Sequence, residues 1–215
     1  MKTKLLILFT LFSTYCLAQL NVVTNNNLII HHGDITLYLS NDTSTLVSKH
    51  SIKYADFLKL DHDRDNRWFV DTYKGKYSKS YYLHTGYDLG HLTPSHITSY
   101  NDTLNHQSFS LFNQAPQLPT FNRGKWARLE GSIEDSIAKH KRDVIIITGV
   151  IYDESKVTYL GTSKIKIPVG YFKILEMSGK TYCWIGSNTT GEVGEITLAD
   201  LNAFITKNGN HLVIK

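Results

Sequence analysis

The chain has 215 residues, of which 41% are hydrophobic and 20% are charged. A chain of this length and composition buries a sizeable core as one globular domain, which excludes global disorder and low-complexity or fibrous architectures. The formal net charge of +4 is compatible with a polyanionic partner, although no strongly basic arm is present. No internal repeat is found, and beyond the N-terminus no apolar run is long enough to span a bilayer.

The first 18 residues have the pattern of a secretory signal peptide. Lys2 and Lys4 precede a largely apolar stretch, and Cys16 and Ala18 occupy the two positions that a signal peptidase reads. We therefore expect cleavage after Ala18, a secreted or periplasmic protein, and a single domain over residues 19–215. A lipoprotein signal with Cys16 as the lipidated residue is the competing hypothesis, which Tyr15 fits poorly because a small residue is wanted there.

Removal of residues 1–18 changes the charge and the cysteine count. Without Lys2 and Lys4 the formal charge falls from +4 to +2, and Cys183 is then the only cysteine. No internal disulfide can form, and Cys183, within the apolar run 182–185, is expected to be an inert core residue.

The mature sequence predicts more strands than helices. The predicted strands are 34–39 and 46–54, paired through a turn at 41–43, then 144–147, and finally 165–175 and 181–185, paired around Gly179. A turn is predicted at Thr85–Gly86. The predicted helices are 121–140, with Thr120 as its N-cap, and a last helix that starts at Thr197 and ends near Gly209. The expected fold class is α+β, with a central antiparallel sheet and helices packed on it.

Four polar motifs follow one another between Tyr87 and Glu130. They are Tyr87-Asp88-Leu89-Gly90-His91-Leu92-Thr93-Pro94, Asn113-Gln114-Ala115-Pro116-Gln117, Asn122, and Trp126-Ala127-Arg128-Leu129-Glu130. Folding alone does not require a Gly-His pair, several amide side chains and a helical carboxylate within one short stretch. The set is typical of a metal-dependent phosphodiesterase centre, which needs a base, a cation and a group that stabilises the leaving oxygen.

His91 is the candidate general base, because an imidazole with an ordinary pKa of ~6.5 takes up a proton near neutral pH. Gly90 before it allows the sharp turn that presents the ring in a cleft. Asn122 is the candidate metal ligand, since one amide oxygen leaves most coordination positions to water, as Mg²⁺ prefers. The ordinary alternatives are a bystander histidine, one of ten in the chain, and an asparagine that caps a helix.

Glu130 follows Asn122 by eight residues, which in a regular helix is a net rotation of ~80° and a rise of ~12 Å. One ion is then not easily bound by both side chains, so Glu130 is expected to orient a metal-bound water. The alternative is a solvated carboxylate that pairs with Lys125 or Arg128. Asp88 is expected to orient the turn or the water shell, or to be an ordinary turn-forming residue.

These motifs resemble those of the DNA/RNA non-specific endonucleases, which are ββα-metal-finger nucleases. The resemblance implies one endonuclease domain over residues 19–215 and a ββα-metal-finger active site. In that site His91, Asp88, Glu130, Asn113 and Gln117 would be the catalytic and supporting residues, and Asn122 the ligand of Mg²⁺, for which Mn²⁺ substitutes. The resemblance further implies cleavage of DNA and RNA with little sequence preference, through contacts to the phosphate backbone. Only residues 87–130 carry specific motifs; weaker similarities extend over Thr148-Gly149, Ile167-Pro168 and 171–173.

Leu89 departs from the family pattern, which has an arginine between the Asp and the Gly. Loss of such a charge-assisted phosphate contact costs ~1.5–3 kcal/mol, or about ten- to a hundredfold in rate or affinity. Arg64, Arg67 and Arg123 are the candidate substitutes, and the sequence assigns none of them.

Two other hypotheses therefore stay open. One is a catalytically weakened relative that binds nucleic acid or a partner protein; the other is a toxin-type effector domain held by an inhibitor or immunity protein. Oligomeric state and the preference for DNA or RNA and for single or double strands are not predicted.

Overall fold

The computed structural model describes residues 20–24, 28–40, 42, 44–61, 65–70 and 77–215. The predicted signal segment, most of the turn at 41–43, and Arg64 lie outside these residues. The strands are β1 (Val22–Thr24), β2 (Leu28–His32), β3 (Ile35–Leu39), β4 (Thr45–Ile52), β5 (Asp88–His91), β6 (Gln114–Gln117), β7 (Val144–Ile151), β8 (Gly170–Met177), β9 (Lys180–Ser187), β10 (Val193–Ile196) and β11 (Leu212–Ile214). The α-helices are α1 (Tyr54–Phe57), α2 (Asp102–Ser108), α3 (Pro119–Phe121), α4 (Ala127–His140) and α5 (Leu198–Lys207).

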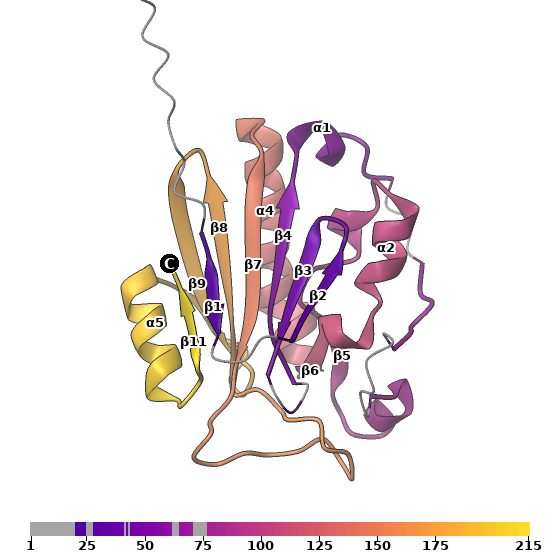
Figure 1. Ribbon diagram of the computed structural model, residues 1–215, viewed down its shortest axis with the longest axis vertical. Coiled ribbons are helices and arrows are strands. Elements are labelled where there is room, and N and C mark those ends of the chain that lie inside the picture. The colour runs from indigo at the N-terminus through magenta and orange to yellow at the C-terminus, as the bar shows by residue number, and fades with distance from the viewer. Residues whose placement is uncertain (1–19, 25–27, 41, 43, 62–64, 71–76) are drawn as a thin grey trace, which may run out of the picture.

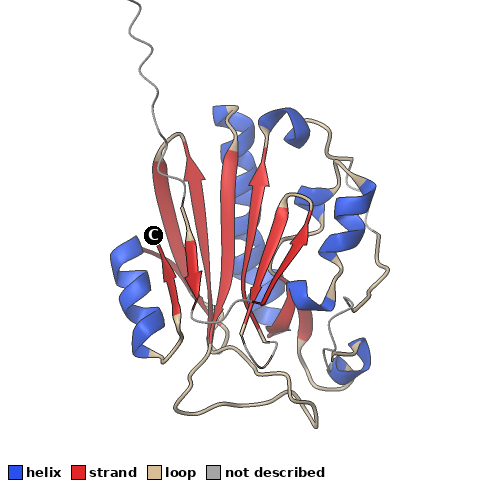
Figure 2. Cartoon of the chain, viewed as in Figure 1, coloured by secondary structure: helices blue, strands red, loops and turns tan. Residues whose placement is uncertain are grey.

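A seven-stranded antiparallel sheet organises these elements, in the order β10-β9-β8-β7-β4-β3-β2. Two smaller pairs, β1-β11 and β5-β6, lie outside it. Helices pack around the sheet (Figures 1 and 2), so the predicted α+β class with a central antiparallel sheet is confirmed. In the described part of the chain, no helix has the length and apolar character needed to cross a membrane.

The main sheet is covered on both faces, which explains the continuous apolar run of β7. On one face, Ile133 and Ile137 of α4 pack with Leu175 of β8. On the other, Ile147 of β7 and Ile174 of β8 belong to a cluster that includes α5 and the β1-β11 pair. Neighbouring side chains on a strand point to opposite faces of the sheet. Because both faces of the sheet are covered here, every side chain in the run 144–147 is expected to be apolar, as predicted for a buried strand.

The hairpin predicted around Gly179 is confirmed. β8 and β9 are joined at Ser178 and Gly179, whose φ angles of 55° and 73° are the left-handed pair of a type I′ turn. The first strand begins at Gly170 rather than at Ile165, because Pro168 has no N–H for a sheet ladder. The short strands β2 and β10 were not predicted.

The long predicted helix is interrupted. A kink within Asn122–Trp126, where Gly124 has the non-helical angles φ −102° and ψ −119°, separates α3 from α4. The prediction that Thr120 caps this helix is wrong: α3 starts at Pro119 after Leu118, because proline at the first helical position has a pre-set φ and no N–H to satisfy. For α5, the predicted start at Thr197 is confirmed: Thr197 is the N-cap, and its hydroxyl accepts the Asp200 N–H at 3.1 Å.

His50 in β4 predicts acid sensitivity of the fold. Burial lowers the pKa of this histidine from 6.5 to about 3. Below pH 6.5 the unfolded chain takes up a proton that the folded chain does not, so stability falls with pH until about pH 3. Between pH 7.5 and pH 5 we expect the free energy of unfolding to drop by about 2 kcal/mol through His50 alone.

Urea unfolding of His50→Phe at both pH values measures this effect. The introduced phenylalanine keeps an aromatic ring against Tyr100, whose hydroxyl still has Asp34 as acceptor. The pH-dependent loss should shrink by about 2 kcal/mol in this variant, whereas the exposed-site control His211→Phe should follow the wild-type profile. Equal losses in wild type and His50→Phe contradict the assignment.

Candidate active site

The site is built on the β5-β6 pair, which places two of the motifs side by side. Asp88 lies opposite Gln117, Gly90 opposite Ala115, and His91 opposite Gln114. The helical segment with Asn122 and Glu130 follows β6 directly, which gives a strand-strand-helix order. In Figure 1, β5 and β6 lie near the lower end of the sheet, where α4 begins. The motif residues of β5, of β6 and of the start of the helical segment thereby lie near one end of the sheet.

Gly90 is required because Gln117 fills the space beside it. A Cβ on Gly90 would lie 2.1 Å from Oε1 and 2.4 Å from Cγ of Gln117. Gln117 is fully buried, and neither polar atom of its amide has a hydrogen-bond partner among the described residues. The prediction of a sharp turn at Gly90 is wrong: Gly90 lies within strand β5, and its φ is not among the positive values of the described glycines. Glycine is needed there for the close approach of Gln117.

Gly90→Ala should therefore destabilise the fold by about 1–3 kcal/mol, the usual cost of overpacking. Adding Gln117→Ala should restore part of that loss, because it removes the atoms that the new methyl group meets. Gly194→Ala is the matched control, since a Cβ there meets nothing within 4 Å. Urea unfolding of the two single variants and the double variant tests this, and a strictly additive double variant refutes the steric explanation.

Asp88 connects the first motif to Asn122. Its Oδ2 accepts the Asn122 Nδ2–H at 2.9 Å and the Arg123 Nε–H at 2.9 Å, and its Oδ1 accepts Arg123 at 2.6 Å. A carboxylate only accepts hydrogen bonds, so it fixes the Asn122 amide with its nitrogen toward Asp88. In the described structure the Asn122 Oδ1 accepts no hydrogen bond, which leaves that oxygen for a ligand. Asp88 is thus placed to orient Asn122.

His91 stands in an aromatic corner. The Trp68 ring lies 5.3 Å from the imidazole, and the Phe109 ring meets it edge-on at 5.0 Å. The Lys79 ammonium lies 5.8 Å above the Trp68 ring. These contacts restrict the ring to one position at the end of β5. Trp68 and Phe109 were not predicted, because neither belongs to a motif and both are distant from His91 in the sequence.

Asn113 holds the loop that follows His91. Its Oδ1 accepts the Thr93 N–H at 3.0 Å, and its Nδ2 donates to the carbonyls of Thr93 at 2.9 Å and Ser108 at 2.8 Å. The residue is fully buried, and its amide is used by backbone groups. It therefore fits the supporting role that the resemblance implied.

Glu130 forms an ion pair with Lys173, a residue of the weakly similar segment 171–173 for which no partner was predicted. Its Oε1 lies 3.1 Å from the Nζ of Lys173 in β8, and that Nζ also donates to the Thr148 hydroxyl at 2.8 Å. The expected alternative pairing with Lys125 or Arg128 is wrong: Lys125 pairs with Glu192 instead. Burial raises the pKa of Glu130, and the nearby Lys173 charge opposes that rise. Lys173 is buried and has the Trp126 ring 5.1 Å away.

A kink in the helical segment changes the relation between Asn122 and Glu130. The expected rotation of ~80° assumed a regular α-helix, and that assumption fails because Gly124 has the non-helical angles φ −102° and ψ −119°. Asn122 lies before this kink and Glu130 lies after it, in α4.

Two of the three candidate phosphate-binding arginines, Arg67 and Arg123, lie within the described residues. Arg67 is bound by Asp65 through Nε at 2.9 and 3.0 Å, whereas Arg123 adjoins the Asp88–Asn122 pair. Leu89 itself packs against an apolar cluster of Tyr82, Leu160 and Ile165. The described residue next to the site that offers a guanidinium is therefore Arg123, whose side chain is 72% exposed.

The groups available for a cation at the candidate site are oxygen atoms, and in the part of the chain that the structure describes they do not form a cluster of several metal-binding side chains. Within the described residues, no group of three His, Cys, Asp or Glu side chains could hold a metal ion. A cation here would rest on the Asn122 oxygen and water, with Glu130 on the same helical segment. Mg²⁺ retains several waters and binds oxygen ligands, so the donor set fits it.

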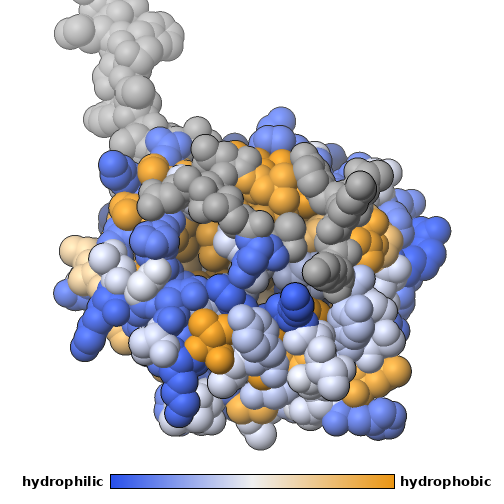
Figure 3. Space-filling view, turned by 60° about the horizontal axis from the view of Figure 1, so that its bottom comes forward, coloured by the Kyte–Doolittle hydropathy of each residue, from blue (hydrophilic) through white to orange (hydrophobic). Residues whose placement is uncertain are grey.

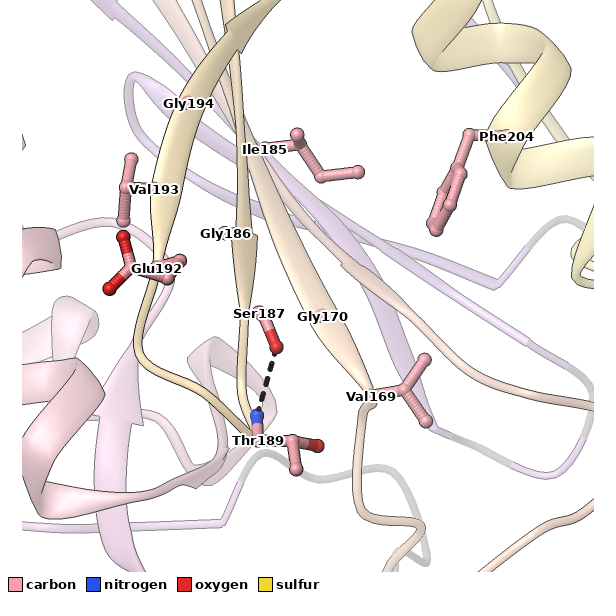
Figure 4. Close-up of a pocket in the computed structure, with 10 residues that line it drawn as sticks. All are labelled: Val169, Gly170, Ile185, Gly186, Ser187, Thr189, Glu192, Val193, Gly194 and Phe204. Atoms are coloured by element: carbon pink, nitrogen blue, oxygen red, sulfur yellow. Dashed lines mark hydrogen bonds between the residues drawn. The ribbon is translucent and has the colours of Figure 1, made fainter.

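A separate cavity of about 530 Å³ lies between β9 and α5 (Figure 4). Ile185 and Phe204 face each other across it, and Val169 closes its lower side. Its one charged lining residue, Glu192, pairs with Lys125. None of the motif residues lines it, so it does not belong to the candidate active site.

Fold and site together give an α+β protein whose motif residues lie on a strand-strand-helix unit. A sequence profile of the DNA/RNA non-specific endonucleases matches residues 16–207. The chain therefore belongs to the DNA/RNA non-specific endonuclease family.

Individual relatives are more distant. The chain is 28% identical over 103 residues to human mitochondrial endonuclease G, and 31% identical over 103 residues to nuclease C1 of Cunninghamella echinulata var. echinulata. Each match covers 44% of this chain, but only 34% and 40% of those relatives. A solved structure described as the EndoG/EndoGI complex superposes with a TM-score of 0.72 at 17% identity, over 86% of both chains. That likeness concerns the fold.

Proposed function

We propose that this chain is a secreted, Mg²⁺-dependent endonuclease that hydrolyses phosphodiester bonds of DNA and RNA with little sequence preference. The observation that carries the proposal is the Asp88–Asn122 hydrogen bond, because it joins the His91 strand to the helix start and leaves the Asn122 oxygen available. Membership of the endonuclease family and the relatives named as nucleases support the same reaction class.

Asn122 and water would hold the ion, and Glu130 would orient one of those waters from its ion pair with Lys173. Bound there, Mg²⁺ supplies charge stabilisation to the phosphoryl group and to the leaving oxygen. Mn²⁺, which accepts similar oxygen ligands, is expected to substitute.

His91 takes a proton from a water molecule whose oxygen attacks phosphorus, the bond from phosphorus to the 3′ oxygen breaks, and that oxygen takes a proton from solvent water. The products are a 5′-phosphate and a 3′-hydroxyl, as the family resemblance implies. Trp68 and Phe109 keep the imidazole in place for this step. Arg123, at the edge of the site, contacts a phosphate of the substrate. It takes the place of the arginine that the family motif has where this chain has Leu89.

Conversion of supercoiled plasmid by the mature protein tests the proposal. Nicking in the presence of Mg²⁺ and its loss in EDTA are expected, with RNA cleaved under the same conditions. Binding should weaken steeply with salt, because phosphate contacts dominate recognition. A folded protein that cleaves neither substrate with Mg²⁺, Mn²⁺ or Ca²⁺ refutes the nuclease proposal.

The alternative is a catalytically weakened relative that binds nucleic acid or a partner protein. Leu89 favours it, since leucine donates no hydrogen bond to a phosphate. Salt-sensitive binding without turnover would support this alternative. The solved structure of a complex between a relative and EndoGI is consistent with an inhibitor as such a partner.

A further inference from the structure

A second cavity, of about 470 Å³, lies beside the candidate active site. Two segments line it: residues 80–87, which lead into β5, and residues 159–167 of the long loop between β7 and β8. Tyr87, on its wall, directly precedes Asp88. Figure 1 shows the long loop running beneath the sheet toward the segment before β5. The cavity therefore opens within a few residues of the proposed phosphate site.

Its walls present aromatic rings to solvent. Tyr81 is 39% exposed and Tyr159 is 52% exposed, one from each segment. Single exposed aromatic side chains are ordinary, but two that line one cavity offer a pair of stacking surfaces. Figure 3 turns this end of the molecule toward the viewer, and hydrophobic side chains reach the surface there between hydrophilic ones.

Hydroxyl groups supply the polar part of the lining. Ser80, Thr85, Thr162 and Ser163 all contribute to it. A hydroxyl both donates and accepts, so it pairs with the edge of any base and does not discriminate among bases. The two lining segments contain no acidic residue, and Lys164 in the loop is exposed. This chemistry suits a neutral base attached to a phosphate backbone.

Leu89 supports the floor of this cavity. It packs against the cluster that contains Leu160, together with Tyr87 and Ile167, and these three residues also line the cavity. An arginine at position 89 would replace an apolar side chain that packs against this cluster with a charged one. The departure from the family motif and the cavity are thus parts of one local arrangement.

We propose that this cavity is a nucleobase-stacking subsite that receives an unpaired base next to the cleaved phosphate, so the protein prefers single-stranded over double-stranded nucleic acid. A base within a duplex is stacked and paired, and its faces cannot reach the two tyrosines. The inference rests on the proposed function for the identity of the substrate. Its test is binding and needs no turnover.

The experiment measures fluorescence anisotropy of a labelled single-stranded DNA of about 12 nucleotides and of the matching duplex, without metal, at one salt concentration. Tyr81→Ala/Tyr159→Ala should weaken single-strand binding by about 10- to 100-fold and duplex binding by less than about threefold. Tyr81→Phe/Tyr159→Phe, which keeps both rings, should retain single-strand affinity within about threefold. A strand of the same length with abasic sites should bind wild type as weakly as the intact strand binds the alanine variant.

An equal loss for duplex and single strand, or no loss for either, overturns the subsite. Tyr159→Ala alone, on an exposed loop position, keeps the test valid if the double variant fails to fold. A base analogue whose fluorescence is quenched by stacking, placed in the single strand, should be quenched by wild type and less so by Tyr159→Ala. Cleavage of plasmid is measured separately, so a lack of turnover with intact single-strand binding refutes the nuclease and leaves the subsite standing.

Discussion

His91→Ala is expected to lower the rate of plasmid nicking by about 10²–10⁴-fold at saturating Mg²⁺, the usual contribution of a general base. The wild-type ring lies between Trp68 and Phe109, so its removal leaves a space of imidazole shape. Added imidazole should enter that space and restore part of the rate, because it supplies the missing base. A purely structural role for His91 predicts no such rescue.

The matched control is His140→Ala, which removes an exposed histidine at the end of α4. It should cleave at the wild-type rate. Thermal unfolding of both variants separates a lost base from a lost fold. Full activity of a folded His91→Ala protein would show that His91 is not the general base. The packing of Trp68 and Phe109 around it would then be structural.

The outline of the fold was predictable because it depends on local pattern. The continuous apolar run of β7, the Ser178–Gly179 turn and the Thr197 cap each carry a signal within a few residues. The kink at Gly124 carries no such signal: Gly124 and the apolar spacing around it are equally compatible with a regular helix. Its consequence for Asn122 and Glu130 therefore required the structure.

The motif residues of the site were predictable from the sequence, but the residues that contact and position them were not. Asp88, His91, Asn122 and Glu130 stand in recognisable order, so their common location could be expected. Lys173 lies more than forty residues after Glu130 and reaches it only because β8 passes beneath α4. A buried lysine is stable when it has such partners, and here Glu130, Thr148 and the Trp126 ring provide them.

Leu89, which replaces the arginine of the family motif, and Arg123, which pairs with Asp88, are best considered together. Leu89 directs its side chain into the cluster under the tyrosine-lined cavity, while Arg123 brings a guanidinium to Asp88 from the helix side. The positive charge is thus present near the proposed phosphate position, although from a different element. Leu89 itself is used for apolar packing.

Asn122→Ala is expected to raise the Mg²⁺ concentration for half-maximal cleavage by at least about tenfold, because it removes the one direct protein ligand proposed for the ion. Asp88 should keep its position through Arg123, which still donates to both of its oxygens. Titration of Mn²⁺ followed by electron paramagnetic resonance measures the metal affinity without turnover. The wild-type protein should deplete free Mn²⁺, and the variant should not.

Asn208→Ala, at the end of α5, is the control for loss of an asparagine remote from the site, and it should bind Mn²⁺ as wild type does. Asp88→Asn tests the orienting role separately, because an amide at position 88 can turn either its oxygen or its nitrogen toward Asn122 and no longer fixes it. We expect Asp88→Asn to weaken Mn²⁺ binding by about 10–100-fold, as is usual for a residue that orients a metal ligand. Unchanged Mn²⁺ binding by a folded Asn122→Ala protein would move the metal site away from Asn122, and the Asp88–Asn122 hydrogen bond would then be structural.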